Sequence, residues 1–348
     1  MLSKAQLLNE LAAFNQHLLE GASTLPLLPQ AAGVTPYEVV YAEDKLQLLY
    51  YQPEYSNGAA PLLIVYALVN RPYMTDLQQG RSLIQGLLAQ GQEVYLIDWG
   101  YPDKLDGLLS LADYINGYLD QCVQVLLHRH SLQQISLLGV CQGGVLSLCY
   151  SALNPHKVKN LITMVTPVNF HTRHNVLSHW VQSMDMGTLC CSSLPVAGQA
   201  LNKVFSNLKP YQLNVSKYLA VVSNLPQSSA LESFILMEQW ITDSPDLASV
   251  ALREFVIEFF QGNKLITGEA KIGECKVDLA QLNMPILNIY ATEDHIVPPE
   301  SSKALGALIG GSYEEFSFKG GHIGIYVSSK AQSQVPVKIS NWLVEHSH

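Results

Sequence analysis

The sequence GVCQG places Cys141 between two glycines, Gly139 and Gly143, directly after the continuous apolar run Gln134–Val140. This spacing is typical of a nucleophile elbow, a strained turn from a buried strand into a helix that accepts only small neighbours around its apex. Serine usually occupies the apex, whereas this chain has cysteine. The N-terminus of the following helix carries a partial positive charge, which favours a thiolate over a thiol. We therefore predict that Cys141 is a nucleophile and that the backbone N–H of Gln142 donates to an oxyanion.

A cysteine nucleophile needs a base, and the base needs a group that orients it. Asp294 lies in the turn after the apolar run Pro285–Ala291, which predicts a strand. His322 follows two glycines after the next predicted strand, Tyr313–Phe318. The chain order of nucleophile, acid and histidine is that of the α/β-hydrolase arrangement. The sequence therefore predicts a triad of Cys141, Asp294 and His322.

Neighbouring residues leave alternatives for two of these roles. Glu293 is an alternative acid and His295 an alternative base, although His295 adjoins Asp294 and would point away from a shared target. We interpret His295 as a residue that packs around the site. The histidines of the segment 171–179 lack a second ligand cluster at metal-binding spacing, so we interpret them as part of a polar loop and expect no metal. The other cysteines are interpreted as small buried apolar residues: Cys122, Cys149, Cys190, Cys191 and Cys275.

The elements that must position these residues alternate between strands and helices. Continuous apolar runs predict buried parallel strands at 62–69, 93–99, 134–140, 160–166 and 285–291, and a more polar strand nearer an edge at 313–318. Apolar residues at helical spacing predict a helix over 111–128. This alternation indicates an α/β fold, whose core we assign to 39–168 and 284–348.

The segment 169–283 differs, because its apolar pattern is helical and contains no clear strand. Helices are predicted over Ser229–Ile241 and Ser249–Phe260, with the helix-breaking sequence DSPD between them. Such an insertion is expected to form a cap over the site. Its apolar side chains could exclude water, although most of them are expected to form the cap's own core: Phe234, Ile235, Leu236, Trp240, Phe255, Phe259 and Phe260. The N-terminal segment 1–38 has Leu2, Leu7, Leu11, Phe14 and Leu18 at helical spacing and predicts a helix packed on the body or on a partner.

The composition excludes several classes of function. Hydrophobic residues make up 48% of the chain and charged residues 14%, with a formal net charge of −9. Nucleic-acid binding needs clustered lysine and arginine, which this balance disfavours. No run approaches the ~18 uninterrupted apolar residues of a membrane span, and the N-terminal segment lacks the continuous apolar region of a signal peptide. Because the cysteines form no disulfide framework, the cytoplasm is the expected location.

Several segments spread from about Val39 to Trp342 carry a resemblance: LLIVYALVNRPYMTDLQ, VYLIDWGYPD, DYINGYLDQCV, LLGVCQGG, MVTPVNF, MEQWITDSPD and GGHIGIYVSSKAQ. Together they resemble the catalytic subunit of polyhydroxyalkanoate synthases, most closely the class III, two-component type. The resemblance implies an α/β-hydrolase fold with a mostly parallel central sheet, helices on both faces and a largely helical cap. It also implies that Cys141, Asp294 and His322 are the catalytic residues and that Val69 supplies the second oxyanion N–H. The segment Gly187–Asn202 departs from the family, because it lacks an expected Gly-Asn-Ile-Pro stretch.

The function implied by the resemblance is an acyltransferase that polymerises (R)-3-hydroxyacyl-CoA, with short side chains such as 3-hydroxybutyryl favoured, and releases CoA. A cysteine suits this reaction, because exchange of one thioester for another keeps the acyl group activated. The base that activates the acceptor hydroxyl is either Asp294 or a histidine that Asp294 only orients. Two alternatives are a thioesterase or esterase that releases free hydroxy acid, and a non-catalytic, granule-associated scaffold.

The resemblance also implies the partners of the chain. No cofactor is expected, since coenzyme A is part of the substrate and a product. The implied partners are the growing polyester chain, a second copy of the chain in a homodimer, a second synthase subunit of the class III type, and the surface of a polyester granule in the cytoplasm.

Overall fold

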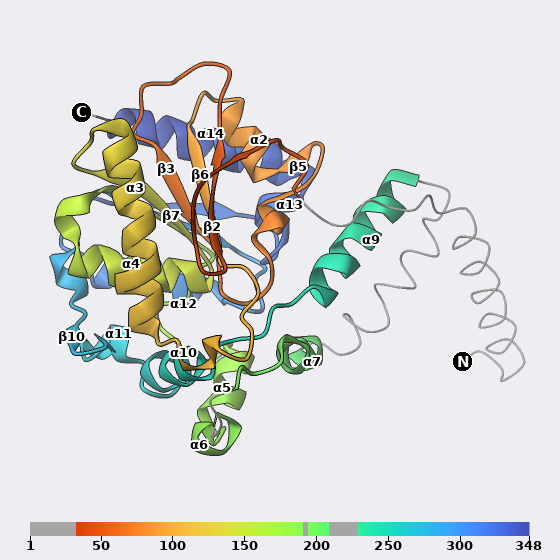
Figure 1. Ribbon diagram of the computed structural model, residues 1–348, viewed down its shortest axis with the longest axis vertical. Coiled ribbons are helices and arrows are strands. Elements are labelled where there is room, and N and C mark those ends of the chain that lie inside the picture. Colours follow the sequence, from red (N-terminus) through yellow and green to blue (C-terminus); the bar gives the residue numbers. More distant parts are fainter. Residues whose placement is uncertain (1–32, 191–193, 209–227, 348) are drawn as a thin grey trace, which may run out of the picture.

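The computed structural model describes residues 33–190, 194–208 and 228–347 (Figure 1). The helix predicted within segment 1–38, with its apolar residues from Leu2 to Leu18, lies outside the described residues. The body is a layered α/β arrangement in which helices cover both faces of a central sheet (Figure 1).

The central sheet has eight strands in the order β1-β2-β6-β3-β7-β8-β11-β12. The strand β2 is antiparallel to both of its neighbours, and every other pair is parallel. The six strands predicted from apolar runs are all present, and the more polar one, β12, lies at an edge as expected. The strand bounds are β1 Glu38–Glu43, β2 Leu46–Tyr51, β3 Leu62–Val65, β6 Val94–Asp98, β7 Ile135–Val140, β8 Val158–Met164, β11 Ile286–Ala291 and β12 Tyr313–Phe318.

The apolar runs form strands because both faces of the sheet are covered. Every residue of β7 is buried, as the continuous apolar pattern of a central parallel strand requires. Successive residues alternate between the faces, so that Leu137 packs into one apolar cluster and Leu138 into the other. One face is covered by α3 (Asp120–His130) and α4 (Gln142–Leu153), and the other by α2 (Leu83–Leu88), α13 (Gly324–Val327) and α14 (Ser329–Glu345).

Short elements join these layers. The predicted helix over 111–128 includes a π-helical stretch, η3, directly before α3. The remaining elements of the core are η1 Pro72–Thr75, β4 Asp76–Gln78, β5 Arg81–Ser82, η2 Asp106–Leu108, η3 Asp113–Leu119, η4 Pro155–Lys157, α12 Pro299–Lys303 and η8 Ala304–Ala307.

The segment 169–283 is mostly helical. Its elements are α5 Val176–Gln182, α6 Met186–Leu189, α7 Gly198–Leu208, α9 Ser228–Thr242, α10 Ser249–Phe255, η6 Val256–Gln261, α11 Lys264–Thr267, β9 Lys271–Ile272, β10 Cys275–Lys276 and η7 Leu279–Gln281. The sequence DSPD separates α9 from α10, as predicted. The expectation of no strand was wrong, because β9 and β10 form a two-residue hairpin too short to leave an apolar pattern. The helix α9 extends away from the body at one side (Figure 1).

The close approach of α4 to the sheet generates a stability prediction. A Cβ atom added at Gly144 would overlap Oγ1 of Thr166 and lie 2.6 Å from its Cγ2. The substitution Gly144→Ala must therefore displace α4, and we expect it to lower the free energy of unfolding by about 1–3 kcal/mol, measured by urea denaturation. The control is Gly117→Ala in η3, where an added Cβ meets no atom within 4 Å. An equal loss of stability in both variants would contradict this account.

Candidate active site

Cys141 lies at the turn between β7 and α4, where its backbone has φ 54° and ψ −120°. Residues other than glycine rarely adopt a positive φ, so the surroundings must hold the backbone of Cys141 in this turn. The N–H of Cys141 donates to the carbonyl of Met164 in β8 at 2.9 Å, and its carbonyl accepts from the N–H of Gly144 at 3.0 Å. The neighbouring strand and the first turn of the helix therefore fix the thiol at the end of the sheet.

The glycines around Cys141 are required by close packing. A Cβ at Gly139 would overlap Cα of Gly144 and lie 2.7 Å from Oγ of Ser147. A Cβ at Gly143 would overlap the carbonyl of Val65 and lie 2.6 Å from that of Tyr66. The glycine spacing that predicted the turn thus has a direct structural cause, since any side chain would push α4 off β3.

The predicted acid and histidine meet beside this turn. Nδ1 of His322, which follows β12, donates to Oδ2 of Asp294, which follows β11, at 2.6 Å. The other carboxylate oxygen accepts the N–H groups of Ile296 at 2.8 Å and Val297 at 2.9 Å. The side chains of His322 and Asp294 are only 6% and 0% exposed. The Asp294 carboxylate is therefore satisfied inside the protein and holds one face of the imidazole.

Cys141 completes this arrangement. Burial disfavours the charged form of His322, but the charges of Asp294 and Cys141 and hydrogen bonds with both hold its pKa well above the usual value. Because Nδ1 is occupied by Asp294, Nε2 is the atom available to the thiol. The structure thus brings Cys141, Asp294 and His322 together.

The alternative acid and base have different surroundings. The N–H of Glu293 donates to the carbonyl of Gly320 at 2.9 Å, a contact that ties together the loops after β11 and β12. His295 lines a separate cavity of about 440 Å³ on another side of Asp294, together with residues such as His174 and Glu300. The carboxylate that contacts His322 belongs to Asp294 and not to Glu293.

The two residues predicted to supply oxyanion donors lie at the cavity beside Cys141. Gln142 and Val69 both line it. The side chain of Gln142 has its own contact, since its Oε1 accepts from the N–H of Leu68 at 2.9 Å. Gln142 and Val69 therefore line the same cavity as Cys141, and the side chain of Gln142 holds the segment that carries Val69.

The cavity at Cys141 has a volume of about 230 Å³ and is lined almost entirely by apolar side chains. Of the apolar cap residues singled out in the sequence, Phe255 and Phe260 line it, whereas Phe259, Leu236 and Trp240 are buried in the two apolar clusters of the core. Sequence reasoning missed the lining from α5 to α7, because its apolar residues have the pattern of any helix core: Leu177, Val181, Met184, Met186, Leu189, Ala200, Leu201, Val204 and Phe205.

The remaining candidates lie apart from the site. His171, His174 and His179 contact three different partners, and the described part of the chain contains no group of three or more metal-ligating side chains. Cys122, Cys149 and Cys190 are buried as expected, but Cys275 is exposed, because it lies in the surface hairpin formed by β9 and β10. Cys191 lies outside the described residues. In the same described ranges, no helix has the length and apolarity to cross a bilayer.

Comparison with known proteins identifies the family. A family model for the α/β hydrolase fold matches residues 60–329, and one for the N-terminus of poly-beta-hydroxybutyrate polymerase matches residues 7–87. The poly(3-hydroxyalkanoate) polymerase subunit PhaC of Thiocystis violacea is 51% identical over 318 residues, which are 90% of this chain and 90% of that protein. The subunit PhaC of Allochromatium vinosum is 49% identical over 346 residues, or 98% and 97% of the two chains.

The chain belongs to the PhaC family of poly(3-hydroxyalkanoate) polymerases. The resemblance to class III synthases is confirmed, and membership in a family of polymerases makes the chain an acyltransferase. Solved structures confirm the α/β-hydrolase fold alone. An α/β hydrolase fold protein from Nakamurella multipartita superposes with a TM-score of 0.51 at 16% identity, covering 90% of this chain and 100% of that one. A serine hydrolase from Cycloclasticus zankles has a TM-score of 0.50 at 12% identity, covering 88% and 98%.

The Asp294–His322 contact generates a prediction for titration. Asp294→Asn removes the negative charge while it keeps the shape of the side chain, and burial of the imidazole still opposes protonation. We expect the pKa of His322 to fall, as measured by NMR titration of its ring resonances. Glu293→Gln, which removes the adjacent carboxylate, is the matched control and should leave that pKa in place. An unchanged pKa of His322 in Asp294→Asn would show that its contact with Asp294 does not determine that pKa.

The same contact predicts a pH dependence of stability. Folding raises the pKa of His322, so its stabilising contribution is complete below the unfolded value of about 6.5. That contribution is lost as the pH rises through the folded pKa. Urea denaturation of the unaltered chain should therefore show a loss of stability across this interval, and Asp294→Asn should show a smaller one.

Proposed function

We propose that the chain polymerises (R)-3-hydroxyacyl-CoA into polyhydroxyalkanoate and releases CoA through a thioester on Cys141. The observation that carries this proposal is the thiol at a strained turn, in contact with a buried Asp294–His322 pair and open to an apolar cavity. The substrate class is supported by the names of relatives that are 47–51% identical over most of the chain. Short side chains, with 3-hydroxybutyryl-CoA as the test substrate, follow from the class III resemblance.

The first half of the reaction loads the enzyme. His322 takes the proton of Cys141, and the thiolate attacks the thioester carbonyl of the acyl-CoA. The developing oxyanion accepts from the N–H groups of Gln142 and Val69. The carbon–sulfur bond to CoA then breaks, and the imidazolium returns its proton to the departing thiolate. One thioester replaces another, so the acyl group remains activated for the next step.

The raised pKa of His322 supports this step. A group that favours its protonated form stabilises the imidazolium beside the thiolate and holds the proton until CoA leaves. Asp294 supplies the largest favourable contribution, since its carboxylate contacts Nδ1 directly.

The second half passes the acyl group to a hydroxyl. The hydroxyl oxygen of another hydroxyacyl unit attacks the thioester of Cys141, its proton goes to a base at the site, and the sulfur is released as a thiol after protonation. Removal of the hydroxyl proton by a positioned base contributes ~10²–10⁴-fold. Water would compete with this hydroxyl, and an apolar lining that offers water few partners disfavours its entry.

The proposal extends to partners. We propose that coenzyme A is substrate and product and that no cofactor takes part. A homodimer and a second synthase subunit follow from the class III resemblance, and the relatives are named as polymerase subunits. Covalent attachment to an insoluble product would hold the chain at the surface of a polyester granule in the cytoplasm, where a reducing environment keeps Cys141 a free thiol.

Substitution of Cys141, and of Cys149 in α4 as the control, tests which cysteine is the nucleophile. Cys141→Ala should abolish both CoA release and acyl-enzyme formation with 3-hydroxybutyryl-CoA. Cys149→Ala should leave both within about 2-fold of the unaltered chain, because burial raises the pKa of Cys149 to about 12 and an inert thiol is not a nucleophile. Thiol release and the labelled acyl-enzyme are measured together with turbidity. An equal loss of CoA release and acyl-enzyme in both variants would contradict the assignment of Cys141 as the nucleophile. A soluble hydroxy acid as the product would show that the chain is a thioesterase and not a polymerase.

A comparison of the two half-reactions assigns the role of Asp294. If Asp294 serves the acceptor hydroxyl, Asp294→Asn should slow chain elongation by ~10²-fold or more and slow the first acylation much less. Rapid-quench measurement of acyl-enzyme formation, set against polymer growth from the same samples, separates the steps. Equal slowing of both steps would show that Asp294 only orients His322.

A further inference from the structure

The segment Leu68–Arg71, here called the oxyanion loop, carries Val69 between the core and the cap. On the core side, the N–H of Leu68 is bound by the side chain of Gln142 at 2.9 Å. The contact is buried and belongs to the residue directly after Cys141. The core therefore fixes the loop on one side of Val69.

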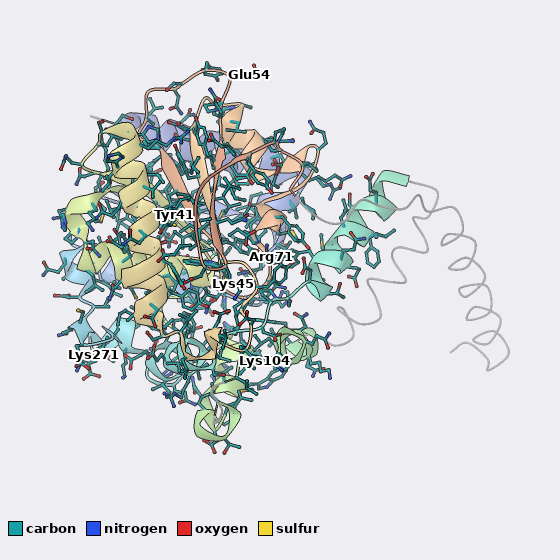
Figure 2. The ribbon with its side chains drawn as sticks, viewed as in Figure 1. Tyr41, Lys45, Glu54, Arg71, Lys104 and Lys271 are labelled. Carbon is teal, nitrogen blue, oxygen red and sulfur yellow. The ribbon has the colours of Figure 1, made fainter. Side chains whose placement is uncertain are left out.

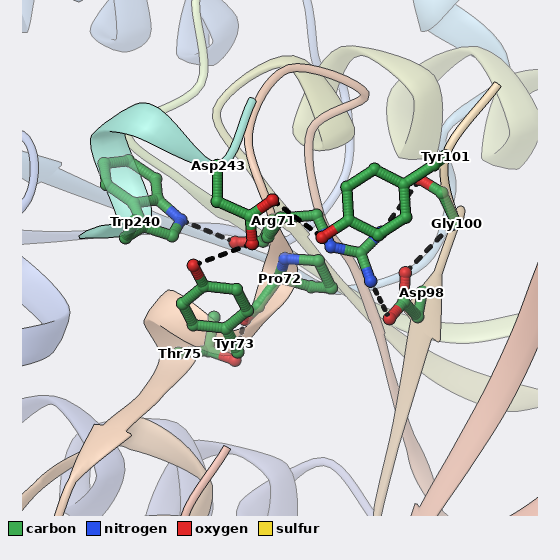
Figure 3. Close-up of polar contacts among 9 residues, drawn as sticks. All are labelled: Arg71, Pro72, Tyr73, Thr75, Asp98, Gly100, Tyr101, Trp240 and Asp243. Atoms are coloured by element: carbon green, nitrogen blue, oxygen red, sulfur yellow. Dashed lines mark hydrogen bonds and ion pairs between the residues drawn. The ribbon is translucent and has the colours of Figure 1, made fainter. Parts of the chain in front are cut away.

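The cap fixes the loop on the other side of Val69. Nδ2 of Asn70 donates to Oγ of Ser244 at 2.7 Å, and Nε1 of Trp240 donates to the carbonyl of Arg71 at 2.7 Å (Figure 3). Trp240 lies near the end of α9, and Ser244 follows that helix. The two residues after Val69 are thus both hydrogen-bonded by the cap.

A carboxylate between these contacts strengthens the junction. Asp243 accepts from the hydroxyl of Tyr73 at 3.0 Å and from that of Tyr101 at 2.7 Å (Figure 3). Tyr73 lies in η1, directly after the loop, and Tyr101 follows β6. One side chain at the end of α9 therefore joins two separate segments of the core.

The side chain of Arg71 joins the same two segments. Its guanidinium contacts Asp98 at 2.6 Å, donates to the carbonyl of Gly100 at 2.8 Å and lies 4.1 Å from the ring centre of Tyr101. Figure 2 shows Arg71 on the side of the body near the base of α9. The loop, the end of β6 and the cap consequently form one connected group of polar contacts.

The loop also contains a residue in the left-handed conformation. Asn70 has φ 63°, which asparagine adopts more readily than other residues that carry a side chain. The position of Val69 therefore depends on the hydrogen bonds on both sides of it, and removal of those from the cap would leave its N–H less restrained.

We propose that Trp240, Asp243 and Ser244 are positioning residues that hold the N–H of Val69 toward the reacting carbonyl, so that acylation of Cys141 depends on a docked cap. This inference rests on the proposed function, in which Val69 donates to the oxyanion. Donors act only when they are aligned in advance with the developing charge, and a displacement of about 1 Å can cost ~10²-fold in rate.

The test removes single polar groups from the junction in the full chain. Trp240→Phe deletes the indole N–H but keeps an aromatic ring, and the double variant Tyr73→Phe with Tyr101→Phe deletes both hydroxyls that Asp243 accepts. Tyr118→Phe is the matched control, since the Tyr118 hydroxyl donates to a carboxylate, Asp44, at 2.7 Å in another part of the core. Two rates are measured: single-turnover acylation by 3-hydroxybutyryl-CoA and alkylation of Cys141 by iodoacetamide, which needs no oxyanion donor.

We expect acylation to slow by ~10–100-fold in Trp240→Phe and in the double variant, with little change in the substrate concentration at half-saturation. Alkylation should not slow, and Tyr118→Phe should match the unaltered chain in both rates. Acylation within about 2-fold of normal in both junction variants would overturn the inference, as would a parallel loss of acylation and alkylation, which indicates a merely structural role. If Trp240→Phe does not fold, the double variant decides, because it removes only hydroxyl groups. Failure of the unaltered chain to form an acyl-enzyme would overturn the proposed function and this inference together.

Discussion

The close approach of α4 to β3 and β8 is the constraint on which the site depends. Because residues 143 and 144 are glycines, α4 lies against the carbonyl groups of Val65 and Tyr66 at the end of β3. It also lies against Thr166, which follows β8. With the helix that close, the chain can turn from β7 into α4 only through a strained residue, and Cys141 is that residue. The packing of the backbone therefore places the thiol at the end of the sheet, whatever contacts the thiol itself makes.

The order of the strands then brings the other groups to the thiol. The sheet runs β3-β7-β8-β11-β12 across this region, with all neighbours parallel, so these strands end at one edge. Cys141 follows β7, the oxyanion loop follows β3 on one side, and Asp294 and His322 follow β11 and β12 on the other. The Asp294 carboxylate is hydrogen-bonded by two backbone N–H groups and by the imidazole. Its charge helps to raise the pKa of His322 and also that of the buried Tyr326.

Much of this arrangement could be predicted from sequence, because local chemistry determines it. Continuous apolar runs predict buried strands, and glycine spacing predicts the turn at Cys141. The antiparallel β1 and β2 were not predicted: none of the residues of β1 is buried, and its pairing with β2 contains a register shift. The cavity lining in α5–α7 was missed because apolar residues that face a cavity look like those that face a core. The junction at Asp243 was missed for another reason: its contact with Tyr73 spans 170 positions, and no local pattern encodes such a pairing.

The apolar cavity favours one orientation of the substrate in the proposed reaction. Among the described residues that line it, none is charged, so the phosphates of CoA would pay a large desolvation cost to enter. The acyl portion of the substrate has no such cost. In the proposed reaction the thioester carbonyl would lie at Cys141, which lines the cavity with Gln142 and Val69, with the acyl chain in the cavity and CoA outside it. In the proposed reaction the acyl group would then remain in the apolar cavity as a thioester of Cys141, while CoA departs to solvent. The thioester and the apolar cap would both preserve an activated acyl group until a hydroxyl reaches it.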